Sequence, residues 1–317
     1  MPLHLTIVMR DWDFVTPLLL GELSDPRIEL DLRGVATLPG FPSAHDGIDG
    51  AEVSVSRLVA KRVGGDARDV GVASFPMRAF RHRCIITRKS HPAQSLEALR
   101  GGRIGVAGWQ DSGNTWTRHA MVSAGVGLDE IHWFMGRMTS ADPVSDGIGQ
   151  FAEPGRIDPV ADDTPLLDLL EQGALDAVFA PFMPEGFFGT GASFRPVLPD
   201  LVGAEMDYFG RHGFVPGIHA MALKQSIVKD HPWLPQALSD LLETSRALWT
   251  AKRQRYSDTS PWLFDEHLRV GRHLPDDWDA SGVDKNAEML ATFIQTAFEQ
   301  GLIPKTVPPQ HVFASEA

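Results

Sequence analysis

The sequence predicts an α/β protein with two lobes, each built on a mixed sheet flanked by helices. Three observations lead to this prediction. Short apolar strands alternate with short helices up to residue 87, the same alternation restarts at Leu96, and the final third of the chain reads as helical. With 317 residues, 43% of them hydrophobic, the chain is long enough to bury a core in each lobe.

The first half supplies the first round of alternation, with glycines and prolines marking the breaks between elements. Residues 49–54 are interpreted as the approach to an amphipathic helix, so that Glu52 would lie near the start of that helix. The expected elements, in order, are strand 3–9, helix 13–20, strand 28–35, a loop at 38–50, helix 55–63 and strands 70–74 and 84–87.

The second half repeats the pattern after Gly101 and Gly102 and then becomes helical. Apolar residues at intervals of three and four predict one buried stripe on each of the two final helices. The expected elements are helix 96–100, strand 103–107, helix 115–124, strand 131–135, irregular loops with a hairpin at 136–163, helix 166–171, strand 176–180, extended segments 194–198 and 220–223, and helices 232–256 and 284–300.

The overall charge argues against several classes of partner. With 41 acidic against 29 basic residues, the formal net charge is -12, and a nucleic acid or an anionic membrane would need a broad positive surface instead. No run of about 18 apolar residues predicts a membrane span, and Arg10 and Asp11 interrupt the first apolar run before it resembles a signal peptide. We therefore expect cytoplasmic residence and no membrane partner. Assembly into a homo-oligomer stays open.

One stretch departs from the acidic background. Residues 70–96 contain no Asp or Glu but contain Arg78, Arg81, Arg83, Arg88 and Lys89. A guanidinium group matches a carboxylate or phosphate with two parallel hydrogen bonds, so this stretch predicts a seat for a small anion. The alternative, that these are solvated loop arginines, carries equal weight on the sequence alone.

His82 lies inside this cationic stretch, between Arg81 and Arg83. Neighbouring positive charges disfavour the imidazolium, so we expect a lowered pKa and a neutral ring near pH 7. The single cysteine, Cys84, excludes an internal disulfide and is interpreted as a small hydrophobic residue of a buried strand.

Common catalytic and cofactor motifs are absent from the sequence. It contains no HExxH, CxxC, Walker lysine loop or GxSxG, and its twelve histidines are scattered. We therefore expect neither a metal site nor a cofactor.

Polar residues at the ends of predicted strands are the remaining candidates, because ligands of open α/β sheets bind outside the carboxyl ends of strands. Each has a structural alternative: a helix cap for Thr115, an ion pair for Arg118, packing for Trp116, a solvated charge for Glu205 and a core histidine for His219. The candidates are Asp11, Glu52, Arg78, Arg81, His82, Thr115, Trp116, Arg118, Glu205 and His219.

An ordered set of short motifs resembles the 4,5-dihydroxyphthalate decarboxylase family, with the similarity running from Leu3 to Asp265. Each motif alone is weak, and the order makes the set specific. The motifs are Asp11 with Asp13, Leu18 to Gly21, the run Asp49, Glu52 and Ser54, the segment FPMRAFRH from Phe75, the triplet Thr115, Trp116 and Arg118, Leu175 to Ala177 with Pro181 and Pro184, Pro216 with His219, and His231 to Trp233.

The resemblance implies the fold of type 2 periplasmic solute-binding proteins, in which the chain crosses twice between two α/β lobes and the ligand lies at the hinge. The crossings would fall near Arg88 and Arg211, which gives one lobe of residues 1–88 and 212–317 and another of 89–211. The insert at 136–163, rich in Asp, Gly and Pro, departs from the family pattern and leaves the substrate less certain than the fold.

The resemblance also implies a carboxy-lyase that converts a 4,5-dihydroxyphthalate-like substrate into 3,4-dihydroxybenzoate and carbon dioxide. Such a site holds two adjacent carboxylates and delivers one proton to a ring carbon. We expect Arg78 and Arg81 to clamp the carboxylates, with Arg118 on the second one, His82 or His219 to be the general acid, and Glu52 to accept from a ring hydroxyl. Asp11, Thr115, Trp116 and Glu205 complete the expected contacts with the small anionic aromatic ligand.

Two other functions remain open, because a fold does not decide a function. One is a solute-binding protein or sensor for a small aromatic carboxylate. The other is a different lyase on the same scaffold, such as the chorismate-processing enzymes of menaquinone synthesis, with a non-aromatic carboxylate as substrate.

Overall fold

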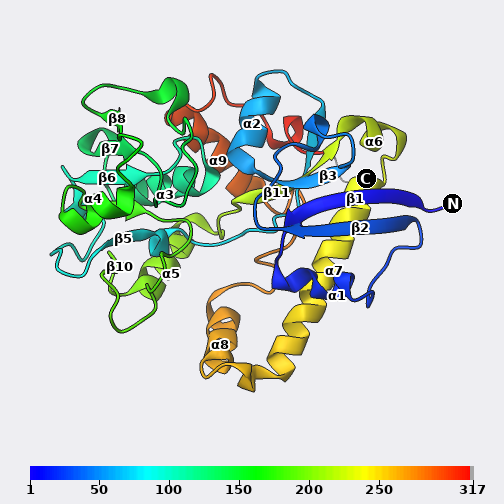
Figure 1. Ribbon diagram of the computed structural model, residues 1–317. Coiled ribbons are helices and arrows are strands. Elements are labelled where there is room, and N and C mark those ends of the chain that lie inside the picture. Colours follow the sequence, from blue (N-terminus) through cyan, green and yellow to red (C-terminus); the bar gives the residue numbers. More distant parts are fainter. Residues whose placement is uncertain (315–317) are drawn as a thin grey trace. The chain divides into compact units, whose positions relative to one another are not determined.

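A computed structural model describes residues 1–314, and the chain divides into two compact units. Unit 1 comprises residues 1–78 and 217–317, and unit 2 comprises residues 79–216. Each unit has a mixed sheet with helices, which confirms the predicted α/β class (Figure 1). Across residues 1–314, no helix combines the length and apolar character that crossing a membrane requires.

The sheet of unit 1 has the strand order β2-β1-β3-β11-β4. β1 runs parallel to β2 and β3, whereas β11 runs antiparallel to β3 and β4. The strands are β1 (Leu3–Arg10), β2 (Ile28–Val35), β3 (Gly50–Ser54), β4 (Asp69–Val72) and β11 (His219–Lys224).

The long helix α7 of unit 1 packs its apolar stripe on this sheet. The main cluster joins Leu5 and Ile7 of β1 and Leu223 of β11 to Leu238 and Leu241 of the long helix α7. The α-helices are α1 (Thr16–Leu19), α2 (Val55–Val63), α6 (Gln225–Asp230), α7 (Leu234–Arg255), α8 (Leu263–His273) and α9 (Ala287–Glu299), and the short 3-10 helices are η1 (Asp13–Val15), η2 (Pro42–Ala44), η7 (Ser257–Thr259) and η8 (Pro309–His311).

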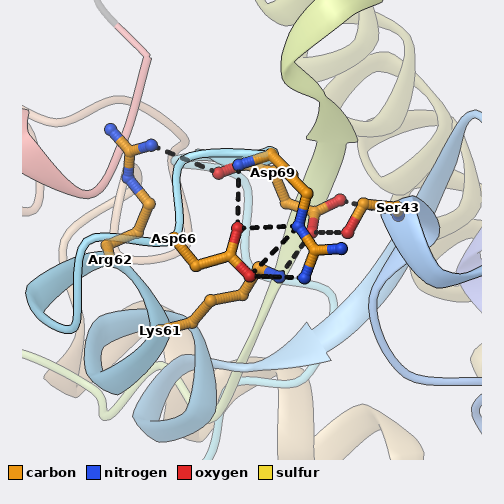
Figure 2. A network of polar contacts seen from close by, with 6 residues as sticks. Ser43, Lys61, Arg62, Asp66 and Asp69 are labelled. Atoms are coloured by element: carbon orange, nitrogen blue, oxygen red, sulfur yellow. Dashed lines mark hydrogen bonds and ion pairs between the residues drawn. The ribbon is translucent and has the colours of Figure 1, made fainter.

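A polar network ties the end of α2 to the start of β4 (Figure 2). The buried carboxylate of Asp69 accepts two hydrogen bonds from Ser43, one from its backbone N–H at 2.8 Å and one from its hydroxyl. The same carboxylate forms an ion pair with Lys61 Nζ at 3.1 Å. Lys61 also donates to Asp66 at 2.8 Å, and Arg62 donates to the carbonyl of His311 at 2.9 Å. Because every charge in this network has a partner, its role is structural.

The sheet of unit 2 has the strand order β10-β5-β9-β6-β7-β8. The pairs from β9 to β8 are parallel, and β5 runs antiparallel to both β9 and β10. The elements are β5 (Ile85–Arg88), β6 (Arg103–Val106), β7 (His132–Met135), β8 (Ile157–Pro159), β9 (Ala177–Phe179), β10 (Phe194–Pro196), α3 (Ser112–Ser123), α4 (Leu166–Gln172), α5 (Leu201–His212), η3 (His82–Cys84), η4 (Glu97–Leu99), η5 (Leu128–Glu130) and η6 (Gly149–Phe151).

The chain passes between the units at Arg78–Ala79 and again at Pro216–Gly217, whereas the sequence placed the crossings near Arg88 and Arg211. The first difference has a clear reason. β5 pairs with β9 and β10 and so belongs to the sheet of unit 2.

Candidate functional site

In unit 1, Glu52 and His219 form a buried acid–imidazole pair. Glu52 lies on the central strand β3 and His219 begins the neighbouring strand β11. His219 is in register with Ser54, and Ser54 and Glu52 lie on one face of β3 because side chains alternate along a strand. The two side chains are therefore diagonal neighbours, and His219 Nδ1 lies 2.6 Å from Glu52 Oε1.

The Glu52 carboxylate is fully committed to partners within unit 1. It has no exposed surface, and its second oxygen accepts from the backbone N–H of Arg10 at 2.9 Å and from the indole N–H of Trp12 at 2.8 Å. This differs from the expectation that Glu52 accepts a hydrogen bond from a substrate hydroxyl. Instead, the carboxylate fixes the orientation of the His219 ring and leaves Nε2 as its second proton-exchanging atom.

In unit 2, Arg81 is a buried cation with no counter-ion among residues 1–314. Its exposed fraction is 3%, and its Nε has no hydrogen-bond partner among residues 1–314. Burial lowers the pKa of the Arg81 guanidinium, the neighbouring Cys84 opposes this, and no acidic side chain acts on it. A buried charge without a partner is costly, so its presence points to an anion that pairs with it.

The Arg81 guanidinium lies against the first turn of α3. A Cβ atom on Gly113, the second residue of that helix, would fall 2.8 Å from Arg81 Nη2, so the absence of a side chain at Gly113 lets the guanidinium lie against the helix. The first N–H groups of an α-helix lack acceptors within the helix and carry the positive end of its dipole. Arg81 and the start of α3 therefore form a site suited to a carboxylate, which we call the anion seat.

Three predicted site residues lie on α3 itself but are buried in its packing. Thr115 Oγ1 donates to the carbonyl of Asp111 at 3.0 Å, and the Trp116 ring packs on Phe214 at 5.5 Å. Arg118, with no exposed surface, donates to the carbonyl of Trp109 at 2.6 Å and stacks on its ring at 4.0 Å. Burial lowers the pKa of Arg118 to about 9. These three side chains pack within unit 2 around the start of α3.

Arg78 is not part of the anion seat. In unit 1 its guanidinium donates to the carbonyl of Trp278 at 2.9 Å and to the side chain of Asn286, and it lies 4.9 Å from the Phe75 ring. Burial lowers its pKa to about 10. The predicted clamp of Arg78 and Arg81 is therefore divided between the two units, and within unit 1 Arg78 joins the segment before α9 to the end of β4.

His82 lies in η3 with its ring edge-on to Tyr208 of α5, the ring centres being 5.3 Å apart. Its pKa falls to about 4, mainly through burial and secondarily through Arg211. The expected direction is confirmed, but the cause is burial and not the flanking Arg81 and Arg83. His82 Nδ1 has no hydrogen-bond partner among residues 1–314.

The sequence did not reveal the cluster around Tyr208. Its hydroxyl bonds to His119 Nδ1 at 2.8 Å, and His212 lies 2.8 Å from the hydroxyl of Ser123. Burial lowers the pKa of His119 to about 4 and raises that of Tyr208. The spacing of Tyr208 and His212 by four residues, and of Trp116 and His119 by three, was the available signal that two helices would pair aromatic faces.

The other two predicted residues occupy separate positions. Asp11 is exposed just beyond the carboxyl end of β1, beside Gly34. Glu205 of α5 has one carboxyl oxygen without a partner among residues 1–314, and burial raises its pKa against the opposing effect of Arg83. Within the same residues, no group of three or more histidines, cysteines and carboxylates is placed to hold a metal ion.

A cavity of about 290 Å³ lies in unit 2, next to the carboxyl ends of β6 and β7. Its lining includes the acidic Asp146 and Asp162 and the basic Arg137, and none of the predicted site residues. Because two acidic residues and one arginine line it, this cavity suits an anionic ligand less well than the anion seat does.

Comparisons with known proteins were made by sequence and by structure. No family model matches the chain. The curated 4,5-dihydroxyphthalate decarboxylase of Comamonas testosteroni is 26% identical over 322 aligned residues, covering 98% of this chain and 96% of the relative. That of Pseudomonas putida is 26% identical over 212, covering 65% and 81%.

Solved structures place the fold. The periplasmic aliphatic sulphonate binding protein SsuA from Escherichia coli has a TM-score of 0.59 at 16% identity, covering 100% of this chain and 94% of that chain. A mutant of the desulfurization enzyme DSZB in complex with biphenyl-2-sulfinic acid has a TM-score of 0.54 at 17% identity, covering 99% and 96%. The fold is thus that of periplasmic binding proteins, and one of these neighbours is an enzyme. The chain is thus similar in sequence to two curated 4,5-dihydroxyphthalate decarboxylases and similar in fold to periplasmic binding proteins.

Proposed function

We propose that the protein is a carboxy-lyase that removes one carboxylate from a dihydroxylated aromatic dicarboxylate of the 4,5-dihydroxyphthalate type. The observation that carries the proposal is Arg81, a buried guanidinium at the start of α3 on which no acidic side chain of the described residues acts. The similarity to the two curated decarboxylases over most of the chain supports an aromatic dicarboxylate as the anion.

The anion seat would hold the carboxylate that stays on the product. A guanidinium can give two parallel hydrogen bonds to one carboxylate, and the N–H groups of the first helical turn add further donors. This grip fixes the orientation of the bound ring, which is the positional part of catalysis. It also supplies a counter-charge for Arg81, so substrate binding should stabilise the fold.

Proton delivery to the ring carbon that bears the second carboxylate starts the reaction. Each carboxylate of 4,5-dihydroxyphthalate has a hydroxyl para to it, and that hydroxyl stabilises the cationic ring formed by protonation. The bond between ring and carboxylate carbon then breaks, its electron pair restores the aromatic ring, and carbon dioxide leaves. The phenolic proton is retained or shared with a nearby base.

His219 is the better of the two candidate proton donors. Glu52 orients its ring through Nδ1, as in other carboxylate–histidine pairs. His82 has a pKa of about 4, so at neutral pH almost none of it carries the proton to be delivered. Glu52 is therefore a positioning residue in this proposal, acting through His219.

The test is to incubate the purified protein with 4,5-dihydroxyphthalate and to follow 3,4-dihydroxybenzoate by chromatography. We expect product with wild-type protein, a fall in kcat of about 10²–10⁴ for His219→Gln, and a smaller effect for His82→Gln. A large loss in His82→Gln alone would move the acid role to His82.

A solute-binding protein is the second candidate, because the SsuA structures share the fold. It predicts that 4,5-dihydroxyphthalate raises the melting temperature without product formation, and that result would overturn the lyase proposal. A different lyase on this scaffold predicts neither product nor a thermal shift with the aromatic dicarboxylate, but turnover of a non-aromatic carboxylate.

A further inference from the structure

Helix α8 of unit 1 presents an uncovered apolar face. Leu263 is its one buried residue, whereas Phe264 and Leu268 are 63% and 39% exposed, and Trp262 just before the helix is 78% exposed. A helix of 11 residues is marginal in water on its own and normally depends on packing of its apolar face. Exposed apolar residues grouped on one helix mark an interaction surface.

The rest of unit 1 gives α8 little cover. The end of α7 and α8 lie beyond the edge of the unit's sheet (Figure 1). A groove of about 670 Å³ lies between the two helices, lined by Trp249 and Thr250 of α7 and by His267 and Val270 of α8. Among the described residues of unit 1, no other element covers the outer face of α8.

The charges on α8 indicate what that partner is. Its first turn carries Asp265 and Glu266, and its second half carries Arg269 and Arg272. Two such helices side by side in opposite directions bring the acidic end of each to the basic end of the other. A two-fold axis at Leu268, the middle of the helix, places Leu268 opposite itself and Asp265 opposite residue 271, beside Arg272.

Local details agree with this arrangement. Gly271 has open space where a Cβ would lie, so a second helix can approach closely there. Asp265 pairs with Arg269 at 2.6 Å within the helix, whereas Arg272 is exposed and has no ion pair within residues 1–314. Two acidic residues balance two arginines, and so the helix lacks the basic face of a membrane-surface helix.

We infer that α8 is a self-association surface on which a second copy of this chain packs in an antiparallel, two-fold arrangement. The apolar centre is Leu268 of both copies, flanked by Phe264 of each copy against the aliphatic stem of Arg272 of the other, with Trp262 at its edge. Asp265 of each copy pairs with Arg272 of the other. Because the contact is isologous, every substitution acts twice in the dimer.

Sedimentation velocity on the full chain over a range of concentrations tests the inference. We expect wild-type protein to reach twice the 34.7 kDa mass of the chain, and Leu268→Asp to remain at the single mass at the same concentrations. The matched control is Val122→Asp, at a position 49% exposed on unit 2, which should associate like wild type. Circular dichroism and melting temperature verify that each variant is folded.

A charge exchange gives the sharper test and does not depend on an apolar residue. Asp265→Arg and Arg272→Asp should each weaken dimerisation by about tenfold or more, whereas the chain carrying both should regain most of the wild-type affinity. A wild-type chain that stays monomeric, a Leu268→Asp chain that still dimerises, or a double variant no better than the singles would each overturn the inference. So would binding of the wild-type monomer to anionic lipid vesicles through α8.

Discussion

At the scale of single residues, we expect Arg81 to lower the free energy of unfolding of the ligand-free protein, although its charge is needed to bind the substrate carboxylate. Replacing it with methionine removes a buried charge and keeps an apolar stem, and such replacements of buried charges are often neutral or stabilising by about 1–4 kcal/mol. We expect Arg81→Met to raise the free energy of unfolding without ligand, measured by urea denaturation, and to lower kcat/KM by at least about 10²-fold.

Arg195 of unit 2 is the matched control for Arg81. Its guanidinium donates to four carbonyls, those of Pro196, Val197, His91 and Ala93, at 2.6–2.9 Å. Arg195→Met leaves these carbonyls without a donor and should destabilise the protein by about 2–4 kcal/mol. If Arg81→Met proved equally destabilising, Arg81 would be a structural residue and the anion seat would be wrong.

Glu52→Gln tests the positioning of His219. The amide oxygen can still accept from Arg10 and Trp12, which turns the amide N–H₂ toward His219 Nδ1 and forces that nitrogen to accept. The neutral ring of His219 then carries its proton on Nε2. When the ring is protonated, the imidazolium no longer has the negative charge of Glu52 beside it. We expect kcat to fall by about 10²–10⁴ while KM changes by only a few fold, measured by product formation.

The exposed carboxylate of Glu29, on β2 of the same sheet, supplies the control for this variant. Glu29→Gln should leave both kinetic constants unchanged. Equal losses of kcat in the two variants, or a Glu52→Gln effect confined to KM, would contradict the positioning role.

At the scale of elements, the packing of η3, α3 and α5 should weaken in acid. His82 on η3 and His119 on α3 have pKa values of about 4, lowered mainly by burial, against about 6.5 in the unfolded chain. Between these values the unfolded chain binds more protons, so stability falls as the pH drops from about 6.5 toward 4. The slope reaches up to about 1.4 kcal/mol per pH unit for each histidine.

Urea denaturation at several pH values measures this slope. His119→Gln should reduce the slope of unfolding free energy against pH by up to the contribution of one histidine, about 1.4 kcal/mol per pH unit. His4→Gln, at an exposed position in unit 1, should keep the wild-type slope. An unchanged slope in His119→Gln would show that the acid sensitivity originates elsewhere.

The elements also show why some predictions from sequence succeed. β2 and α2 have the predicted bounds, because one is a long extended run and the other an amphipathic run ended by two glycines. β3 was missed because Ala51 and Val53 give too short an apolar signal. Its strand conformation comes from pairing with β1 and β11, which are distant in sequence. Since Glu52 lies on β3, its hydrogen bond with His219 could not be predicted from the sequence either.

For a related reason, the sequence predicted the segment that contains the anion seat but not which of its arginines contributes to it. The absence of acidic residues around position 81 is a local property that the sequence displays. Which arginine nitrogens find partners is a tertiary property: Arg78 donates to acceptors at residues 278 and 286, two hundred positions away, whereas Arg81 Nε finds no acceptor within residues 1–314. Composition therefore identified the segment, and only the folded chain separated its two arginines.

At the scale of the whole molecule, the net charge of -12 opposes the approach of a dianionic substrate, whereas the buried guanidinium of Arg81 attracts it. Salt screens the two effects differently. The Debye length falls from about 30 Å at 0.01 M to about 8 Å at 0.15 M ionic strength, which suppresses the long-range repulsion, while a buried contact is screened much less. We therefore expect KM to fall by a few fold as ionic strength rises over this range.

Initial rates in sodium chloride from about 0.01 to 0.15 M at constant pH measure this effect. Repeating the series with neutral catechol as a competitive ligand is the control, because an uncharged ligand should show little salt dependence. A KM that instead rises steeply with salt would mean that exposed cations such as Arg83 and Lys89 hold the substrate. In that case the cationic stretch would act as a solvated surface, and the buried guanidinium would not be the group that recognises the carboxylate.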